Sequence, residues 1–355
     1  MSRRTPRLAA LLLAALLAAC AGQGTGPPGH FVPGVGAPAA IGNAVPPAGP
    51  PLTPLLADKV LVAADGTRLP LRVWLPQGKP RAMILALHGF NDYSNAFTGP
   101  AEAWAKVGIA TYAYDQRGFG EAPLRGRWPG ERQLADDLAT ASRLLHARHP
   151  GVPLYLLGES MGGAVVIAAM TGAAGTPPPA ADGIILSAPA VWGRDTMNVF
   201  ERAALWTGDA LFPGMMLTGR GLKIKPSDNI EMLRGLARDP LVIKETRVDT
   251  IKGLVDLMDM ALAAAPEVTA PMLLLAGDRD EVVPPGATRL WVDHLPYPAR
   301  MTRRIALYAE GYHMLLRDLE APLVLNDVAS WIADHRAPLP SGADRRASAE
   351  LFARR

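Results

Sequence analysis

The fold class of this 355-residue chain follows from one stretch, Leu154-Tyr155-Leu156-Leu157-Gly158-Glu159-Ser160-Met161-Gly162-Gly163. Its first four residues form an apolar run typical of a buried strand, and the residues after Ser160 predict a helix over 161–171. Between them lies the pattern Gly-x-Ser-x-Gly, in which a serine on a tight strand-to-helix turn is exposed at the edge of a sheet. The positive end of the helix dipole behind this turn favours negative charge. The stretch therefore predicts an α/β sheet that presents Ser160 as a nucleophile.

Short apolar runs and helical patterns alternate outward from this stretch, which predicts a mostly parallel sheet with helices on both faces. The predicted strands are 60–63, 69–75, 83–87, 109–114, 154–157, 184–186, 272–276 and 305–308, and the predicted helices are 101–107, 131–149, 161–171, 286–295 and 324–335. Asp65-Gly66 predicts a hairpin between the first two strands. Residues 191–266 contain helix-like pieces and no convincing strand. We expect this interval to form a helical cap over the carboxyl edge of the sheet, where ligands bind in open α/β folds.

The composition supports a large folded core. Hydrophobic residues make up 49% of the chain and charged residues 19%, which excludes a wholly disordered protein. The net charge of +3 comes from three arginines at positions 3, 4 and 7. Since no basic stripe remains without them, we expect no nucleic-acid partner. The single cysteine, Cys20, excludes an intramolecular disulfide and a cysteine-rich metal site.

The first twenty residues predict a secretory signal. The three arginines precede an apolar run at 8–19 and then Cys20. A helix of twelve residues spans about 18 Å, too short for a bilayer core of about 30 Å. Leu17-Ala18-Ala19-Cys20 resembles the bacterial lipobox, in which the cysteine is lipidated and becomes the first residue of the mature protein. The alternative is an ordinary signal peptide in which Cys20 is incidental. By the precedent of lipoproteins, Ala21 favours the outer membrane.

Three further segments complete the predicted organisation. Residues 21–50 contain eight glycines and seven prolines, which predicts a disordered tether. Residues 51–337 should form the folded domain, with the cap at about 191–266. The segment 338–355, with prolines near its start and several arginines, is predicted to be a basic, disordered tail.

A serine hydroxyl needs a base that takes its proton. Of the seven histidines, His88 and His313 follow predicted strands at the carboxyl edge. His88 abuts a glycine turn and is interpreted as a brace for that loop, so we predict that His313 is the base. A carboxylate must orient the imidazole. The loop after strand 272–276 offers Asp280, our prediction, and Asp278 as the alternative.

An oxyanion intermediate needs two backbone donors. We predict the amide of Met161, directly after the nucleophile, and the amide of Phe90, in the loop after strand 83–87. Asp115 and Arg117 follow another strand, and we interpret them as residues that fix a loop rather than line the cleft.

Together these motifs resemble the monoacylglycerol lipase and lysophospholipase branch of the α/β-hydrolases, often described as serine aminopeptidase-like. The motifs are Leu87-His88-Gly89-Phe90, Tyr114-Asp115-Gln116-Arg117-Gly118-Phe119-Gly120, Gly158-Glu159-Ser160-Met161-Gly162-Gly163, Gly277-Asp278-Arg279-Asp280 and Gly311-Tyr312-His313. The resemblance covers about 58–335 and implies an α/β-hydrolase fold with a helical cap. It also implies a Ser160–His313–Asp280 triad, oxyanion amides at Phe90 and Met161, no metal and no cofactor. Glu159 departs from the histidine common at its position.

The expected function is hydrolysis of a carboxylic ester, most simply a monoacylglycerol or a lysophospholipid. The cap carries large apolar residues that could receive an acyl chain or only attach the cap to the core: Trp192, Phe200, Leu205, Trp206, Leu211, Phe212, Met215, Met216 and Leu217. A non-lipid esterase, an acyltransferase or a peptidase would use the same triad. A peptidase that accepts a free α-amino group would need an acid near the cleft, and Glu159 is the candidate. The non-enzymatic alternative is a binding or scaffold lipoprotein of the cell envelope.

Overall fold

The computed structural model describes residues 53–219, 221–296 and 303–352. The predicted signal peptide, Cys20 and the Gly/Pro-rich tether lie outside these residues. Within them, no helix is long and apolar enough to cross a membrane.

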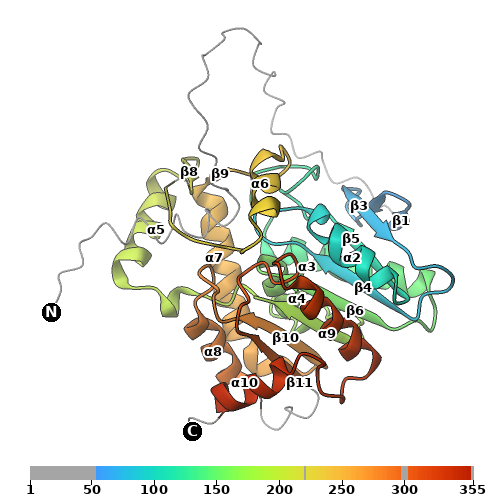
Figure 1. Ribbon diagram of the computed structural model, residues 1–355. Coiled ribbons are helices and arrows are strands. Elements are labelled where there is room, and N and C mark those ends of the chain that lie inside the picture. Colours follow the sequence, from blue (N-terminus) through green and yellow to red (C-terminus); the bar gives the residue numbers. More distant parts are fainter. Residues whose placement is uncertain (1–52, 220, 297–302, 353–355) are drawn as a thin grey trace.

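A single nine-stranded sheet forms the centre of the molecule, in the order β1-β2-β3-β5-β4-β6-β7-β10-β11 (Figure 1). The strands are β1 Leu55–Ala57, β2 Val60–Val62, β3 Arg68–Trp74, β4 Ala82–Leu87, β5 Ile109–Tyr114, β6 Leu154–Glu159, β7 Gly183–Ser187, β10 Met272–Gly277 and β11 Arg303–Tyr308. The first three strands pair antiparallel, and β3 is also antiparallel to β5. The remaining strands of this sheet, β5, β4, β6, β7, β10 and β11, run parallel to one another. The predicted hairpin around Asp65 is confirmed as β2 and β3. The parallel strands end at one edge, which gathers the loops that follow β4, β6, β10 and β11.

Helices cover both faces of the sheet, as predicted. They are α2 Thr98–Ala105, α3 Glu131–Arg148, α4 Met161–Met170, α7 Val248–Ala263, α8 Pro285–His294, α9 Ala321–Ala333 and α10 Ala343–Phe352. Because side chains alternate along a strand, β4 serves two cores. Met83 and Leu85 pack in the cluster shared with α3, α4, α7 and α8, while Ile84 and Ala86 pack in the cluster shared with α2 and α9. Both clusters are buried, so β4 lies at the centre of the domain and holds its following loop firmly.

The cap differs from the prediction in two ways. It contains α5 Val199–Leu211 and α6 Ile230–Arg238, together with a short antiparallel pair, β8 Met216–Thr218 and β9 Glu245–Arg247, where no strand was expected. Each of these strands has only three residues, too few for an alternating pattern to be recognised. The predicted interval 191–266 also includes α7, which packs against α4 in the main core. The cap proper therefore ends near β9.

The prediction of a disordered tail at 338–355 is wrong for residues 338–352. Helix α10 packs against β11, and Asp344 is buried and pairs with Arg304 at 3.1 Å. Arg346 of the same helix pairs with Asp278 in the loop after β10. The arginines of this segment suggested a basic, disordered tail because Asp278, the partner of Arg346, lies 68 positions earlier in the chain, and Arg304, the partner of Asp344, lies 40 positions earlier. The tail is instead part of the fold.

Candidate functional site

Ser160 lies on the sharp turn between β6 and α4, in the predicted strand–turn–helix setting. Its backbone has φ 53° and ψ −116°, a conformation that L-residues rarely adopt. The turn closes because glycines allow backbones to touch: a Cβ on Gly162 would lie 2.2 Å from the Leu87 carbonyl oxygen. A Cβ on Gly158 would lie 2.4 Å from the Gly162 carbonyl carbon. Such strain typically costs 1–3 kcal/mol and persists where the surrounding structure enforces it, commonly at active sites.

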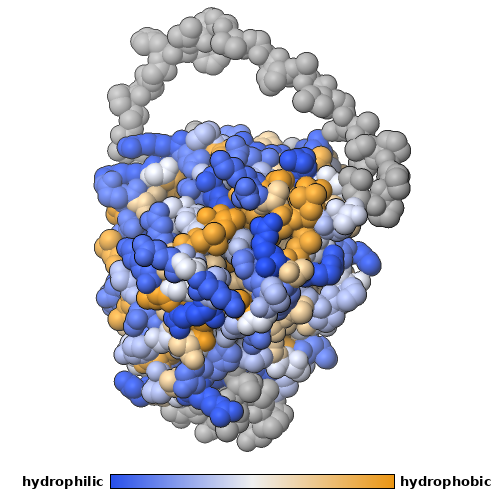
Figure 2. All heavy atoms as spheres, turned by 90° about the vertical axis from the view of Figure 1, so that its right-hand side faces the viewer, coloured by the Kyte–Doolittle hydropathy of each residue, from blue (hydrophilic) through white to orange (hydrophobic). Residues whose placement is uncertain are grey.

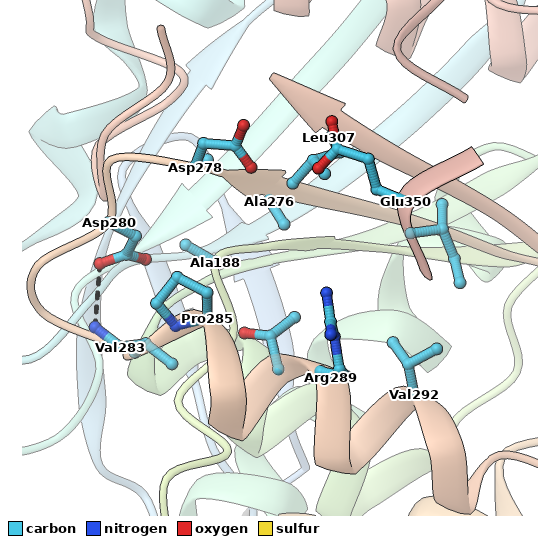
Figure 3. A pocket seen from close by; sticks show the side chains of 13 residues that line it. Ala188, Ala276, Asp278, Asp280, Val283, Pro285, Arg289, Val292, Leu307 and Glu350 are labelled. Atoms are coloured by element: carbon cyan, nitrogen blue, oxygen red, sulfur yellow. Dashed lines mark hydrogen bonds between the residues drawn. The ribbon is translucent and has the colours of Figure 1, made fainter. Parts of the chain in front are cut away.

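His313 and Asp280 come together from the loops that follow β11 and β10. His313 Nδ1 lies 2.9 Å from Asp280 Oδ2, and both side chains are buried. The other carboxylate oxygen of Asp280 accepts the backbone N–H group of Val282 at 2.8 Å. It also accepts that of Val283 at 2.9 Å, the bond drawn in Figure 3. These donors hold Asp280 as an acceptor, so His313 donates from Nδ1. This tautomer leaves Nε2 free of a proton, as a base requires.

The charge state of His313 reflects two opposing effects. Burial is the largest single effect and lowers the pKa of the imidazole, but the charge and hydrogen bond of Asp280, together with the charges of Glu159 and Asp318, raise it by more. The net pKa therefore lies above the ordinary value of 6.5. A raised pKa suits a group that must hold a proton during one step and release it in the next.

Asp278, the alternative acid, is engaged elsewhere. Its carboxylate pairs with Arg346 of α10, and in Figure 3 it lies on the Glu350 side of the loop, away from Val283. Behind the loop, α8, α10 and the sheet enclose a cavity of about 70 Å³ that both Asp278 and Asp280 line. The structure thus brings Asp280, not Asp278, to His313.

The loop after β4 lies directly against the nucleophile. A Cβ on Gly89 would be 3.4 Å from Ser160 Cβ, which leaves little space between the two backbones. Phe90, Ser160 and His313 line one cavity, and Met161 is the first residue of α4. Both predicted oxyanion residues are therefore placed beside Ser160.

His88 has the bracing position expected of it. Its Nε2 accepts the backbone N–H of Gln116 at 2.9 Å, so its proton is on Nδ1, which donates to the Gly89 carbonyl at 2.9 Å. Burial lowers the pKa of His88 and keeps the ring neutral. Arg117 also has the structural position predicted for it, since it pairs with Asp65 at 2.7 Å and Asp137 at 2.6 Å.

A buried ionic cluster that no sequence pattern predicted lies in the wall of the same cavity. Arg317 Nη2 lies 2.6 Å from Glu159 Oε1, and Arg317 Nη1 lies 2.8 Å from Asp92 Oδ2. The sequence alone suggests Glu159 only as a possible acceptor for a substrate ammonium group. Asp92, Glu159 and Arg317 are far apart in the chain, so no local sequence pattern indicates that they form a cluster. The remaining wall of the cavity is mainly apolar and includes Leu254, Val282, Val283 and Met314.

No group of three or more His, Cys, Asp or Glu side chains in the described part of the chain is arranged to hold a metal ion. What the site does contain is a serine on a strained turn, a histidine–carboxylate pair and a loop that packs on the serine. This arrangement is suited to nucleophilic acyl transfer.

Comparison with known proteins gives a consistent family. Residues 78–320 match the family described as Hydrolase_4, serine aminopeptidase, S33. The chain is 28% identical over 291 residues to a monoacylglycerol lipase of Mycolicibacterium smegmatis, covering 79% of this chain and 98% of that one. It is 28% identical over 288 residues to a monoglyceride lipase of Rattus norvegicus, covering 78% and 90% of the two chains.

Solved structures agree on the fold. A soluble variant of monoglyceride lipase from Saccharomyces cerevisiae superposes with a TM-score of 0.65 at 19% identity, over 85% of this chain and 100% of that one. The monoacylglycerol lipase of Paleococcus ferrophilus gives 0.63 at 23% identity, over 75% and 99%. The fold is that of the α/β-hydrolases, and the chain belongs to the Hydrolase_4 (serine aminopeptidase, S33) family.

Proposed function

We propose that this protein is a serine hydrolase that cleaves carboxylic esters of lipid type, monoacylglycerols or lysophospholipids, through an acyl-enzyme on Ser160. The observation that carries the proposal is the placement of Ser160, on its strained turn, in one cavity with the hydrogen-bonded His313–Asp280 pair. The lipid class is supported by relatives that are monoacylglycerol and monoglyceride lipases.

The proposed reaction has two halves. His313 Nε2 takes the hydroxyl proton as Ser160 Oγ attacks the ester carbonyl, and Asp280 stabilises the imidazolium. The amides of Phe90 and Met161 stabilise the oxyanion. The C–O bond then breaks, and the alcohol leaves with the proton from His313. In the second half, His313 deprotonates a water that attacks the acyl-enzyme, and the fatty acid is released.

The cap offers a surface suited to lipid. Of the nine apolar cap residues considered from the sequence, Trp192 and Leu205 are buried and attach the cap to the core. Phe200 and Trp206 are 71% and 73% exposed. With them, α5 and the segment that follows expose five more large apolar side chains: Val199, Leu211, Phe212, Met215 and Met216. Exposed apolar patches of this kind mark binding surfaces.

Figure 2 views the molecule from the side away from α5. Figure 2 shows the face beside β1, β3 and α2, where hydrophilic side chains predominate and hydrophobic ones form separate patches. The apolar cluster of the cap lies on α5, at the other end of the view in Figure 1. The exposed apolar side chains of α5 and of the segment after it support approach of a lipid substrate from the cap side.

A peptidase is the main alternative with the same triad. It would need a free acid near the cleft to accept a substrate ammonium group. Glu159 is the acid that sequence analysis proposed, but its carboxylate is already paired with the Arg317 guanidinium and is buried. That pairing favours an ester with an uncharged acyl part over a substrate with a free amino group.

Fatty-acid release from long-chain 1-monoacylglycerol tests the proposal. We expect turnover of this substrate that exceeds turnover of a short activated ester in kcat/KM, because the apolar cap surface contributes binding energy only to the long chain. Titration of the released acid measures the rate of hydrolysis of each ester. Cleavage of the short ester alone would mean that the triad works on another class of ester, and the lipid assignment would be wrong.

We further propose that the protein is a lipoprotein anchored through Cys20 to the bacterial outer membrane. The support is the lipobox-like sequence at 17–20, the glycine- and proline-rich segment that follows, and Ala21. Stable anchoring of this kind needs more than one acyl chain. We expect metabolic labelling with a fatty-acid analogue and recovery in the outer-membrane fraction, both abolished in Cys20→Ser. An unlabelled wild-type protein would contradict the anchor, and recovery in the inner membrane would contradict the location.

A further inference from the structure

One buried arginine of the histidine loop contacts two of the other loops that meet at Ser160. Arg317 lies four residues after His313, Glu159 directly precedes the nucleophile, and Asp92 lies two residues after Phe90. The ion pairs of 2.6 and 2.8 Å therefore connect the histidine loop, the nucleophile turn and the oxyanion loop.

Burial makes these pairs consequential. The side chain of Arg317 is 9% exposed, that of Asp92 3% and that of Glu159 2%. Surface ion pairs contribute little, but removal of one partner from a buried pair leaves an uncompensated charge. The two carboxylates raise the pKa of Arg317 further above its ordinary value despite its burial. The guanidinium is therefore permanently charged, and the loops it joins cannot separate without exposing buried charge.

The shape of arginine matters as well as its charge. A guanidinium presents two Nη groups in a fixed plane, so it can hold two carboxylates at a set separation. A lysine ammonium is a point charge on a flexible stem and cannot fix two partners in the same way. The cap reaches this residue too, since Asn229 Nδ2 donates to the Arg317 carbonyl at 2.9 Å.

We propose that Arg317 is a positioning residue of the hydrolase: through Glu159 and Asp92 it fixes the nucleophile turn and the oxyanion loop relative to His313. This inference rests on the proposed serine-hydrolase function. The cluster also affects the electrostatics at His313, because its Glu159, like Asp280 and Asp318, raises the pKa of that imidazole.

The chain supplies a matched control for loss of a buried arginine. Arg117 is also 9% exposed in its side chain and also pairs with two carboxylates, Asp65 and Asp137. Its partners lie outside the wall of the catalytic cavity. Arg117→Met and Arg317→Met therefore both remove an arginine that bridges two acids. Only Arg317→Met removes ion pairs between loops that carry catalytic groups.

The first experiment compares these two variants with a short activated ester. We expect Arg317→Met to lower kcat/KM by about 100-fold, because a displacement of about 1 Å between reacting groups has an effect of that size. Arg117→Met should stay within about threefold of wild type per folded molecule. Circular dichroism gives the folded fraction. Arg317→Lys, which keeps the charge without the planar bridge, should give an intermediate value. Equal losses in the two methionine variants would overturn the inference.

The second experiment measures the pH profile of kcat/KM, whose position on the pH axis a general loss of stability would not change. Glu159→Gln keeps the shape of the side chain and can still accept from Arg317, but it removes a negative charge that raises the pKa of His313. We expect the acidic limb of the pH profile of kcat/KM to shift to lower pH by about half a unit or more. Asp137→Asn, the corresponding change at the control cluster, should leave the limb in place. An unshifted limb in Glu159→Gln would also overturn the inference.

Failure of the underlying function would look different. Wild-type protein that neither cleaves the ester nor reacts with a fluorophosphonate at Ser160 would contradict the hydrolase itself. Active wild-type protein with an Arg317→Met variant no worse than Arg117→Met would contradict the positioning role alone.

Discussion

Ser160→Ala is expected to reduce ester hydrolysis by about 10⁴-fold or more, because no other group can form the acyl-enzyme. The variant should remain folded. Alanine is no larger than serine, and the close contacts of the turn are made by Gly158 and Gly162, which are unchanged. Fatty-acid release and reaction with a fluorophosphonate measure the loss, and thermal unfolding checks the fold.

Ser187→Ala is a suitable control for this experiment. Ser187 is fully buried at the end of β7, and its hydroxyl has no hydrogen-bond partner within the residues that the structure describes. We expect this variant to keep its activity. Retention of activity in Ser160→Ala would reject the nucleophile assignment. Absence of fluorophosphonate labelling in the wild type would favour a non-catalytic envelope lipoprotein.

Asp280→Asn is expected to lower kcat by about 10⁴-fold, as loss of the orienting carboxylate does in other serine hydrolases. An amide can still accept the N–H groups of Val282 and Val283, so the loop should keep its conformation. It cannot stabilise the charged imidazolium, and it permits the wrong tautomer of His313. The effect should therefore fall on kcat rather than on folding.

Asp278→Asn provides the comparison two residues away. Its carboxylate pairs with Arg346 on the outer side of the loop and does not contact His313. We expect a loss of less than about tenfold, through the position of the loop alone. Steady-state kinetics on both variants decides the assignment. A larger loss in Asp278→Asn than in Asp280→Asn would reassign the catalytic acid.

Local signals in the sequence predicted the nucleophile turn and the sheet except for its first strand, β1. Strands such as β4 and β6 are continuous apolar runs because helices bury both of their faces, and the glycines around Ser160 occur where backbones touch. His313 and Asp280 could be predicted because parallel strands end at one edge, so the loops after β10 and β11 must meet there.

Features that depend on distant partners were not predictable in this way. Arg317 acquires its role only when segments near positions 92, 159 and 317 are folded together. Helix α10 was misread for the same reason, because its Arg346 and Asp344 pair with Asp278 and Arg304, which precede them by 68 and 40 positions. The pair β8 and β9 was missed because three residues carry too little periodicity.

The position of α10 has a practical meaning for preparing the protein. This helix is the last described element of the chain, and through Arg346 it holds the loop that carries the catalytic acid candidate. Shortening the chain to the end of α9, or to the family match at 78–320, which ends before α9 begins, removes that support together with the buried Asp344. The expressed protein should therefore include α10. An affinity tag fused after it needs a spacer long enough to leave the packing of α10 against β11 undisturbed.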